Sequence, residues 1–159
     1  MPGLVIARFS EEEPPELPGG SSARFRVVRG EGRWLLLTEA DEAAPGSEYY
    51  REIFRPPDAM AVGESAQYVF LIRIDVAPDL DHAAFNEWYN GTHVPEVGPA
   101  GLRRGKRYES DIPGWPYMAL YDMDDRDTLE SEALAKVRGF YQFTPQITAI
   151  ERTVLERVD

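Results

Sequence analysis

The chain has 159 residues, of which 43% are hydrophobic and 28% charged, and this balance is typical of one ordinary globular domain or two very small ones. Acidic residues outnumber basic ones 28 to 17, and the formal charge of −11 argues against nucleic acids and anionic membranes as partners. The absence of cysteine excludes disulfides and thiolate chemistry, and two histidines are too few for a histidine-rich metal site.

The first third of the chain is predicted to be mainly strands. Residues 4–9 form a short apolar strand, and the prolines, glutamates and glycines of residues 11–20 indicate a loop. Residues 24–29 and 34–38 read as a hairpin around a glycine-rich turn. A short helix is expected over residues 48–54, because a serine precedes it and two prolines follow.

The rest of the chain alternates strands and helices. The expected elements are a strand over 68–76, a helix over 80–93 that ends at Pro95, a hairpin over 106–110 and 117–123, a helix over 128–137 capped by Asp127, and a closing strand over 147–158. No apolar run approaches the roughly 20 residues that span a bilayer, and no secretory signal is visible at the start. We therefore expect a cytoplasmic protein without membrane contact.

A weak internal repeat relates the two halves. At an offset of 83, residues 24–25 fall on 107–108 and residues 34–41 fall on 117–124 without a gap. The second half follows the β-α-β-β-α-β order of a ferredoxin-like unit, and the first half follows it without the first helix. We expect an α+β fold in which a degenerate unit (1–60) and a complete unit (61–159) cover each other's sheets as an intramolecular dimeric α+β barrel.

The strongest sign of chemistry is the predicted helix that ends near His93. Its spacing gathers aromatic rings, a hydroxyl and an imidazole on one face: Phe85, Trp88, Tyr89, Thr92 and His93. Burial and the helix dipole act in opposite directions on His93, so an imidazole there can titrate near neutrality and act as acid or base. The alternative is a histidine that caps the last helical carbonyls.

Three segments resemble the dimeric α+β barrel superfamily, in particular its EthD-like members. They are WYNGTHVPE at 88–96, GLRRGKRY at 101–108 and PYMALYD at 116–122. The resemblance implies a pocket between sheet and helices, as in the cofactor-independent isomerases, polyketide cyclases, monooxygenases and haem enzymes of the superfamily. It also implies that His93 faces this pocket, and the first half has no equivalent histidine.

The resemblance and the spacing together define candidate site residues. His93 and Tyr89 are the catalytic candidates, and the substrate-binding candidates are aromatic residues of the helix and the hairpin: Phe85, Trp88, Tyr108, Tyr117 and Tyr121. Each of these aromatic side chains has ordinary core packing as its alternative. We expect neither a cofactor nor a metal ion.

Other polar residues receive simpler interpretations. Asn86, Glu87 and Asn90 are expected on the solvated helix face, whereas Glu96 either orients His93 or lies on the surface. The aspartates of residues 122–127 lack the glycine and glutamate of a calcium loop and indicate a turn. The glycine-rich turns do not connect a strand to a helix, so nucleotide binding is unsupported.

The sequence thus predicts a cofactor-independent enzyme that catalyses proton transfer on a hydrophobic carbonyl or polyketide-like small molecule. The reaction would be an isomerisation, a cyclisation or an elimination, with His93 as general acid or base. The alternatives are a cofactor-free monooxygenase of the same fold and a non-catalytic small-ligand-binding protein. A homodimer is possible, and no nucleic acid or membrane partner is expected.

Overall fold

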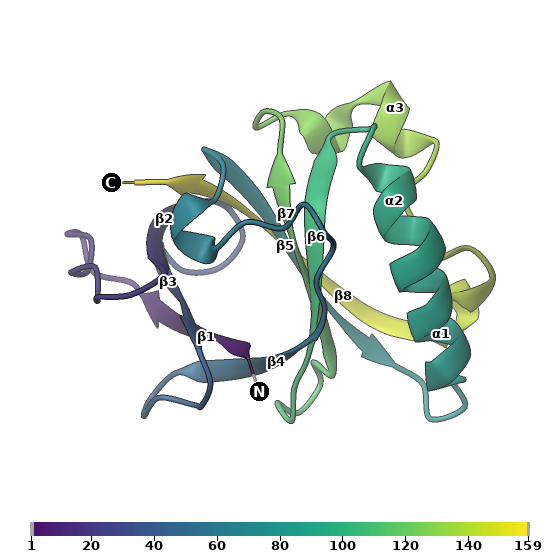
Figure 1. Cartoon of the computed structure of the whole chain (residues 1–159), viewed down its shortest axis with the longest axis horizontal. Helices are drawn as coiled ribbons and strands as arrows, with labels where there is room; N and C mark the ends of the chain where they lie inside the picture. The colour runs from purple at the N-terminus through teal and green to yellow at the C-terminus, as the bar shows by residue number, and fades with distance from the viewer. Residues whose placement is uncertain (1, 159) are drawn as a thin grey trace.

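Eight antiparallel strands form one closed barrel in the computed structural model, which describes residues 2–158 (Figure 1). The strands are β1 (Gly3–Phe9), β2 (Ser22–Arg29), β3 (Trp34–Ala40), β4 (Glu48–Phe54), β5 (Tyr68–Val76), β6 (Leu102–Glu109), β7 (Tyr117–Met123) and β8 (Ile147–Arg157). Around the barrel they follow the order β1-β3-β2-β8-β5-β7-β6-β4.

Each half of the barrel has the strand order of a ferredoxin-like sheet. The first half runs β4-β1-β3-β2 and the second runs β8-β5-β7-β6, which is fourth-first-third-second in both. Two antiparallel seams join the halves, one between β4 and β6 and the other between β2 and β8. The expected fold class, two ferredoxin-like units closed into an intramolecular α+β barrel, is confirmed.

The repeat at an offset of 83 matches structurally equivalent strands. Trp34 and Tyr117 are the first residues of β3 and β7, the third strand of each half. Phe25 and Tyr108 on the second strands both point into the barrel, where their side chains are buried in the same apolar cluster. The division into units at residues 60 and 61 stays a prediction.

The helix expected over residues 48–54 is wrong, because this segment is strand β4. Its aromatic and β-branched residues suit a strand, and it pairs with β1 on one side and β6 on the other. Tyr50 is fully buried inside the barrel. A helix here would leave the barrel open, so long-range pairing overrides the local capping signal.

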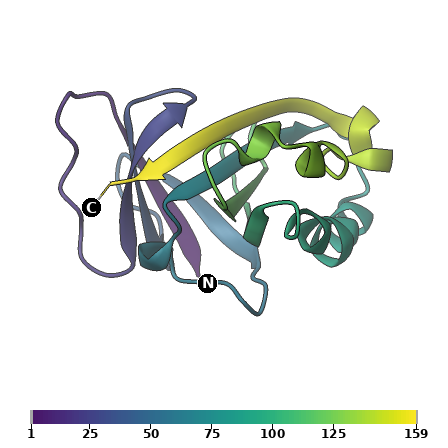
Figure 2. The ribbon, with the colours of Figure 1, turned by 90° about the horizontal axis from the view of Figure 1, so that it is seen from above.

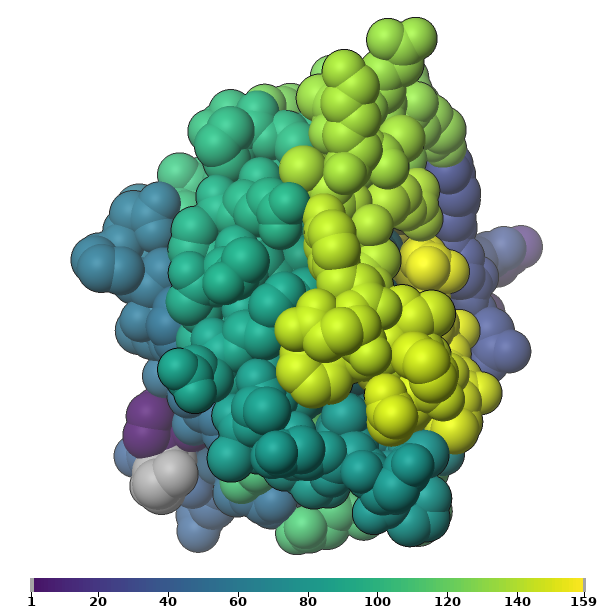
Figure 3. All heavy atoms as spheres, turned by 90° about the vertical axis from the view of Figure 1, so that its right-hand side faces the viewer, coloured from purple at the N-terminus to yellow at the C-terminus, as the bar shows by residue number. Residues whose placement is uncertain are grey.

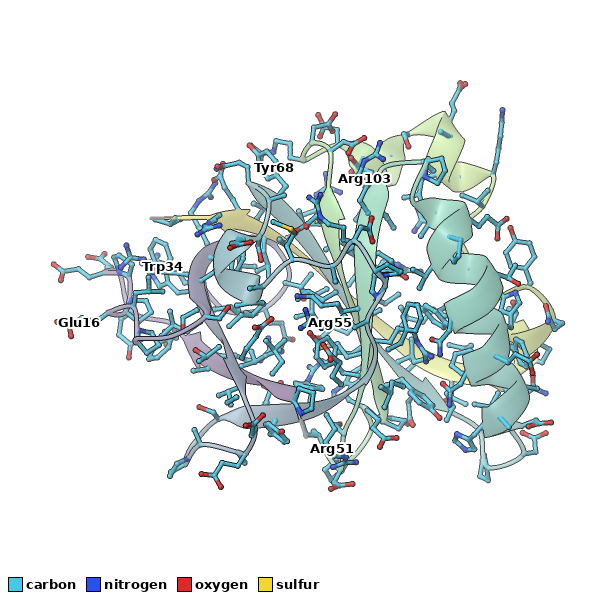
Figure 4. All side chains as sticks on the ribbon, viewed as in Figure 1. Glu16, Trp34, Arg51, Arg55, Tyr68 and Arg103 are labelled. Atoms are coloured by element: carbon cyan, nitrogen blue, oxygen red, sulfur yellow. The ribbon has the colours of Figure 1, made fainter. Side chains whose placement is uncertain are left out.

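The first half consequently has no helix over its outer face among the described residues, and the 10–21 loop lies there instead. The Trp34 indole Nε1 donates a hydrogen bond to the Glu11 carbonyl oxygen at 3.1 Å. Arg24 donates to the Pro15 carbonyl oxygen at 3.0 Å. Figure 4 shows Trp34 beside this loop, with Glu16 near its outer end.

The second half carries a helical layer on its outer face (Figures 1 and 2). It consists of α1 (His82–Trp88), the π-helical turn η2 (Tyr89–His93), α2 (Val94–Val97), the 3-10 turns η3 (Thr128–Glu130) and η4 (Tyr141–Gln146), and α3 (Glu132–Ala135); a further 3-10 turn, η1 (Val62–Glu64), precedes β5. Within residues 2–158, no helix is long and apolar enough to cross a membrane.

Two helix boundaries differ from the sequence expectation. Pro95 does not end the first helix, because it lies in the first turn of α2, where proline needs no hydrogen-bond partner for its nitrogen. The second helix is broken into η3 and α3, and its cap is Ser131, whose hydroxyl accepts a hydrogen bond from the Leu134 amide, rather than Asp127. The layer over the sheet is therefore irregular on this side.

Candidate functional site

A cavity of about 220 Å³ lies between the outer face of the second sheet and its helical layer. Its walls are mainly apolar and include Phe70, Ile72, Val97, Leu102, Leu134 and Phe140. Figure 3 shows the covering face, with α1 and α2 in teal beside the green-to-yellow segment that contains α3 and η4, and a recess opens next to that segment. A small, largely apolar pocket of this kind suits an organic ligand.

His93 lines this cavity, as the sequence predicted. It is only 6% exposed, stacks on Trp88 with ring centroids 4.8 Å apart, and meets Tyr89 edge-on at 5.0 Å. Its Nδ1 has no hydrogen-bond partner within residues 2–158, so the side chain does not cap the helix. A buried imidazole without a partner on a cavity wall is available to a ligand.

The pKa of His93 is lowered from its ordinary value of 6.5 to about 4. Burial is the largest cause, Glu96 acts in the opposite direction, and the Arg107 cation lowers the pKa further. The expectation of titration near neutrality is therefore wrong. The helix continues through α2 to Val97, so His93 is not at a helix end and gains little from the dipole. At neutral pH the imidazole is uncharged and can accept a proton.

Two tyrosines lie on the same cavity wall. The Tyr121 hydroxyl faces the Tyr89 hydroxyl at 3.4 Å, and both side chains are buried. Burial raises the pKa of both phenols, so both remain protonated at neutral pH. The cavity thus combines a neutral imidazole with two hydroxyl donors, a set that can remove a proton and stabilise the oxyanion that results.

Arg107 lies beneath this wall and was not foreseen as a site residue. It is 1% exposed, its guanidinium carbon lies 4.1 Å from the centroid of the Tyr89 ring, and one of its terminal nitrogens has no partner in the described chain. The other donates hydrogen bonds at 2.9 Å to the side-chain oxygens of Asn86 and Asn90. The expectation that these two asparagines face solvent is therefore wrong.

The π-helical turn η2 accounts for a different misplacement, that of Thr92. The Val94 amide bonds to the Tyr89 carbonyl five residues earlier, and the wider turn rotates the following side chains relative to a regular α-helix. Thr92 is consequently exposed, whereas the expected face placed it with His93. Regular helical spacing cannot place residues across such a turn.

The remaining aromatic candidates lie outside the cavity lining. Phe85 and Trp88 belong to the aromatic cluster behind His93 and Tyr89. Tyr117 lies on the same sheet face as Tyr121, as strand alternation predicts, but its hydroxyl bonds to His82 Nδ1 at 2.6 Å. They surround the site without lining it.

Two further candidates contact other groups. Tyr108 points to the other side of the sheet, into the barrel, and so is not part of this site. Glu96 accepts a hydrogen bond from the Tyr141 hydroxyl at 2.9 Å, and no hydrogen bond joins it to His93 within the described chain. The negative charge of Glu96 nevertheless raises the pKa of His93.

Two arginines on the lining were also missed by the sequence interpretation. Arg138 follows α3, and Arg152 lies on β8 opposite Ile72 of β5. The alternation of β8 carries a signal for Arg152, since Ile150 and Arg152 share a face. In the part of the chain that the structure describes, no three histidine, aspartate or glutamate side chains lie close enough together to hold a metal ion.

Comparisons with known proteins identify the fold and no activity. No family model matches the chain, and no curated protein is similar to it in sequence. A solved structure described as a major regulator of staphylococcal pathogenesis superposes with a TM-score of 0.67 at 10% identity, covering 99% of both chains. Dimeric chlorite dismutase from Nitrobacter winogradskyi reaches a TM-score of 0.49 at 11% identity, over 98% of this chain and 99% of that one. The first likeness establishes a common α+β barrel fold along the whole chain.

Proposed function

We propose that the protein is a cofactor-independent enzyme that catalyses proton transfer on a small hydrophobic carbonyl compound of the polyketide-like class, by isomerisation, cyclisation or elimination. The observation that carries the proposal is the uncharged, unpartnered imidazole of His93 on the wall of an apolar cavity. This chemistry also agrees with the sequence resemblance to EthD-like proteins.

The reaction begins when a nitrogen of His93 takes a proton from the carbon next to the substrate carbonyl. The electrons of that C–H bond form the double bond of an enolate, whose oxygen accepts a hydrogen bond from the Tyr121 or Tyr89 hydroxyl. The enolate charge stabilises the new imidazolium, which offsets the burial that holds its pKa low in the empty pocket. Where the substrate carries a β,γ double bond, the enolate is conjugated with it, and return of the proton at the γ-carbon shifts the double bond and completes an isomerisation.

The proposal is tested with 2-tetralone as a probe ketone in D2O. NMR follows the loss of its α-protons, which reports enolisation directly and needs no knowledge of the natural substrate. Wild-type protein should accelerate the exchange, and His93→Gln should reduce the catalysed rate by about 10²–10⁴-fold. His82→Gln, at the other histidine of the chain and outside the cavity, is the matched control and should leave the rate unchanged.

An unchanged exchange rate in His93→Gln would falsify the role of this histidine. Consumption of oxygen by the wild-type protein would favour the monooxygenase alternative, and binding without exchange would favour a ligand-binding protein. The cytoplasmic location and a homodimer stay predictions, and light scattering after size exclusion tests the homodimer.

A further inference from the structure

The lining of the cavity is basic although the protein as a whole is acidic. The chain carries a formal charge of −11, with 28 acidic residues. The residues that line the cavity nevertheless include Arg138 and Arg152, and they include no aspartate or glutamate. The local charge is thus opposite in sign to that of the whole molecule, which is the condition for selective attraction of an anion.

The two arginines lack the acidic partners that most arginines of this chain have. Among residues 2–158, the ion pairs with carboxylates include those of eight arginines: Arg8, Arg26, Arg29, Arg51, Arg55, Arg73, Arg103 and Arg104. Arg138 donates one hydrogen bond, at 3.1 Å, to the Leu129 carbonyl oxygen. Within residues 2–158 neither Arg138 nor Arg152 has a carboxylate within ion-pair distance, so their guanidinium groups keep free donors at the cavity.

The two cations also act on each other. Burial lowers the pKa of Arg152, and the charge of Arg138 lowers it further, which places the guanidinium groups within electrostatic range. In the helical layer, Glu130 of η3 interacts electrostatically with Arg138, but its carboxylate forms an ion pair with Arg29 from β2. Two cations held near each other are unfavourable, and an anion bound between them relieves this repulsion.

We propose that the cavity binds a hydrophobic carboxylate, with its carboxyl group on Arg138 and Arg152 and its apolar body against the aromatic and aliphatic walls. Guanidinium groups suit this role because their paired N–H donors match the two oxygens of a carboxylate. The cavity volume of about 220 Å³ fits a compact body of one or two fused rings or a medium-length alkyl chain. This inference rests on the proposed function, since it defines the substrate class of the same pocket.

Isothermal titration calorimetry at pH 7 tests the proposal with two probes that share a naphthalene ring, 2-naphthoate and the neutral 2-naphthalenemethanol. The acid should bind about tenfold more tightly than the alcohol, because charge-assisted hydrogen bonds replace neutral ones. The double variant Arg138→Gln/Arg152→Gln should lose about that tenfold for the acid and keep its affinity for the alcohol within twofold. Both arginines are exposed at the cavity, so the variant should fold normally.

The matched control is Arg33→Gln/Arg126→Gln, which removes two positive charges from exposed residues that do not line the cavity. It should leave both affinities unchanged. Equal affinity of the two probes, an equal effect of the two double variants, or no binding of either probe would overturn the carboxylate site. Arginine-dependent binding of the acid without exchange of 2-tetralone would instead support this site and count against the proton-transfer function.

Discussion

The two halves of the barrel share one strand order and differ in what covers them. On the outside of the first half, the 10–21 loop contacts Arg24 of β2 and Trp34 of β3. Strands β5–β8 are covered by α1, η2, α2 and α3, and the apolar cavity beside His93 lies beneath this layer. The two halves therefore share the strand order that closes the barrel, and only the second half has the helical layer that encloses the candidate site.

The barrel interior belongs to both halves. Leu4, Phe25 and Leu35 from the first half pack in one cluster with Leu71 and Leu120 from the second. At one end, Arg73 of β5 bonds to Glu48 of β4 at 3.2 Å and to Glu151 of β8 at 2.7 Å, which ties the halves together. The interior is thus a structural core, distinct from the outer cavity that carries the candidate chemistry.

The largest expected effect comes from truncating one leucine in each layer. Leu35 of β3 is fully buried in the barrel, and Leu134 of α3 is 1% exposed and lines the cavity. Leu35→Ala and Leu134→Ala should each lower the free energy of unfolding by about 2–5 kcal/mol, measured by urea titration. Only Leu134→Ala should change the affinity for 2-naphthoate under conditions in which both variants are folded. A comparable loss of binding in Leu35→Ala would mean that packing inside the barrel also determines the shape of the outer cavity.

A second effect is a loss of stability at low pH, which depends on His93 in the helical half. The pKa of His93 is about 4 in the folded protein, mainly because of burial, against 6.5 ordinarily. Because the folded value is depressed, the unfolded chain takes up the proton first as pH falls. Stability is fully present above pH 6.5 and declines towards pH 4, by up to about 3 kcal/mol.

Urea unfolding at pH 7 and pH 4 measures this effect as the difference between the wild type and His93→Gln, so that titration of the carboxylates cancels. The wild type should lose more stability on acidification than the variant. His82→Gln, which removes the other histidine of the chain, should match the wild type. An equal loss in the wild type and His93→Gln would contradict a neutral, buried imidazole.

The sequence predicts best those parts of the two halves in which the backbone is regular. Composition and alternation identify three strands of the first half and all four of the second, and the 83-residue offset matches the second and third strands of each half. The fourth strand of the first half was misread, since its partners β1 and β6 are distant in sequence and local signals resemble a helix. Helical spacing correctly places His93 and Tyr89 on the buried side of one continuous helical segment, and their catalytic role stays a prediction.

The residues that were missed depend on irregular geometry. Asn86 in α1 and Asn90, one turn later in the π-helical turn η2, hold the buried Arg107 through their side-chain oxygens, although both were expected to face solvent. Arg138 reaches the cavity from the short segment between α3 and η4, whose path follows no periodic pattern. Periodicity can place a residue only where the backbone itself is periodic.

The smallest expected effect is also the most specific, since it separates charge from burial at His93. Glu96 raises the pKa of His93 and Arg107 lowers it, while burial lowers it most. Arg107→Met should therefore raise this pKa and Glu96→Gln should lower it, each by a few tenths of a unit to about one unit, measured by NMR titration of the imidazole protons. Methionine preserves the buried volume, and glutamine keeps an acceptor for the Tyr141 hydroxyl. A variant that merely loosens the helical layer would expose the imidazole and raise the pKa in both cases. A downward shift in Glu96→Gln cannot arise in that way, so opposite signs would establish that the charges of Arg107 and Glu96, and not only burial, determine the pKa of His93.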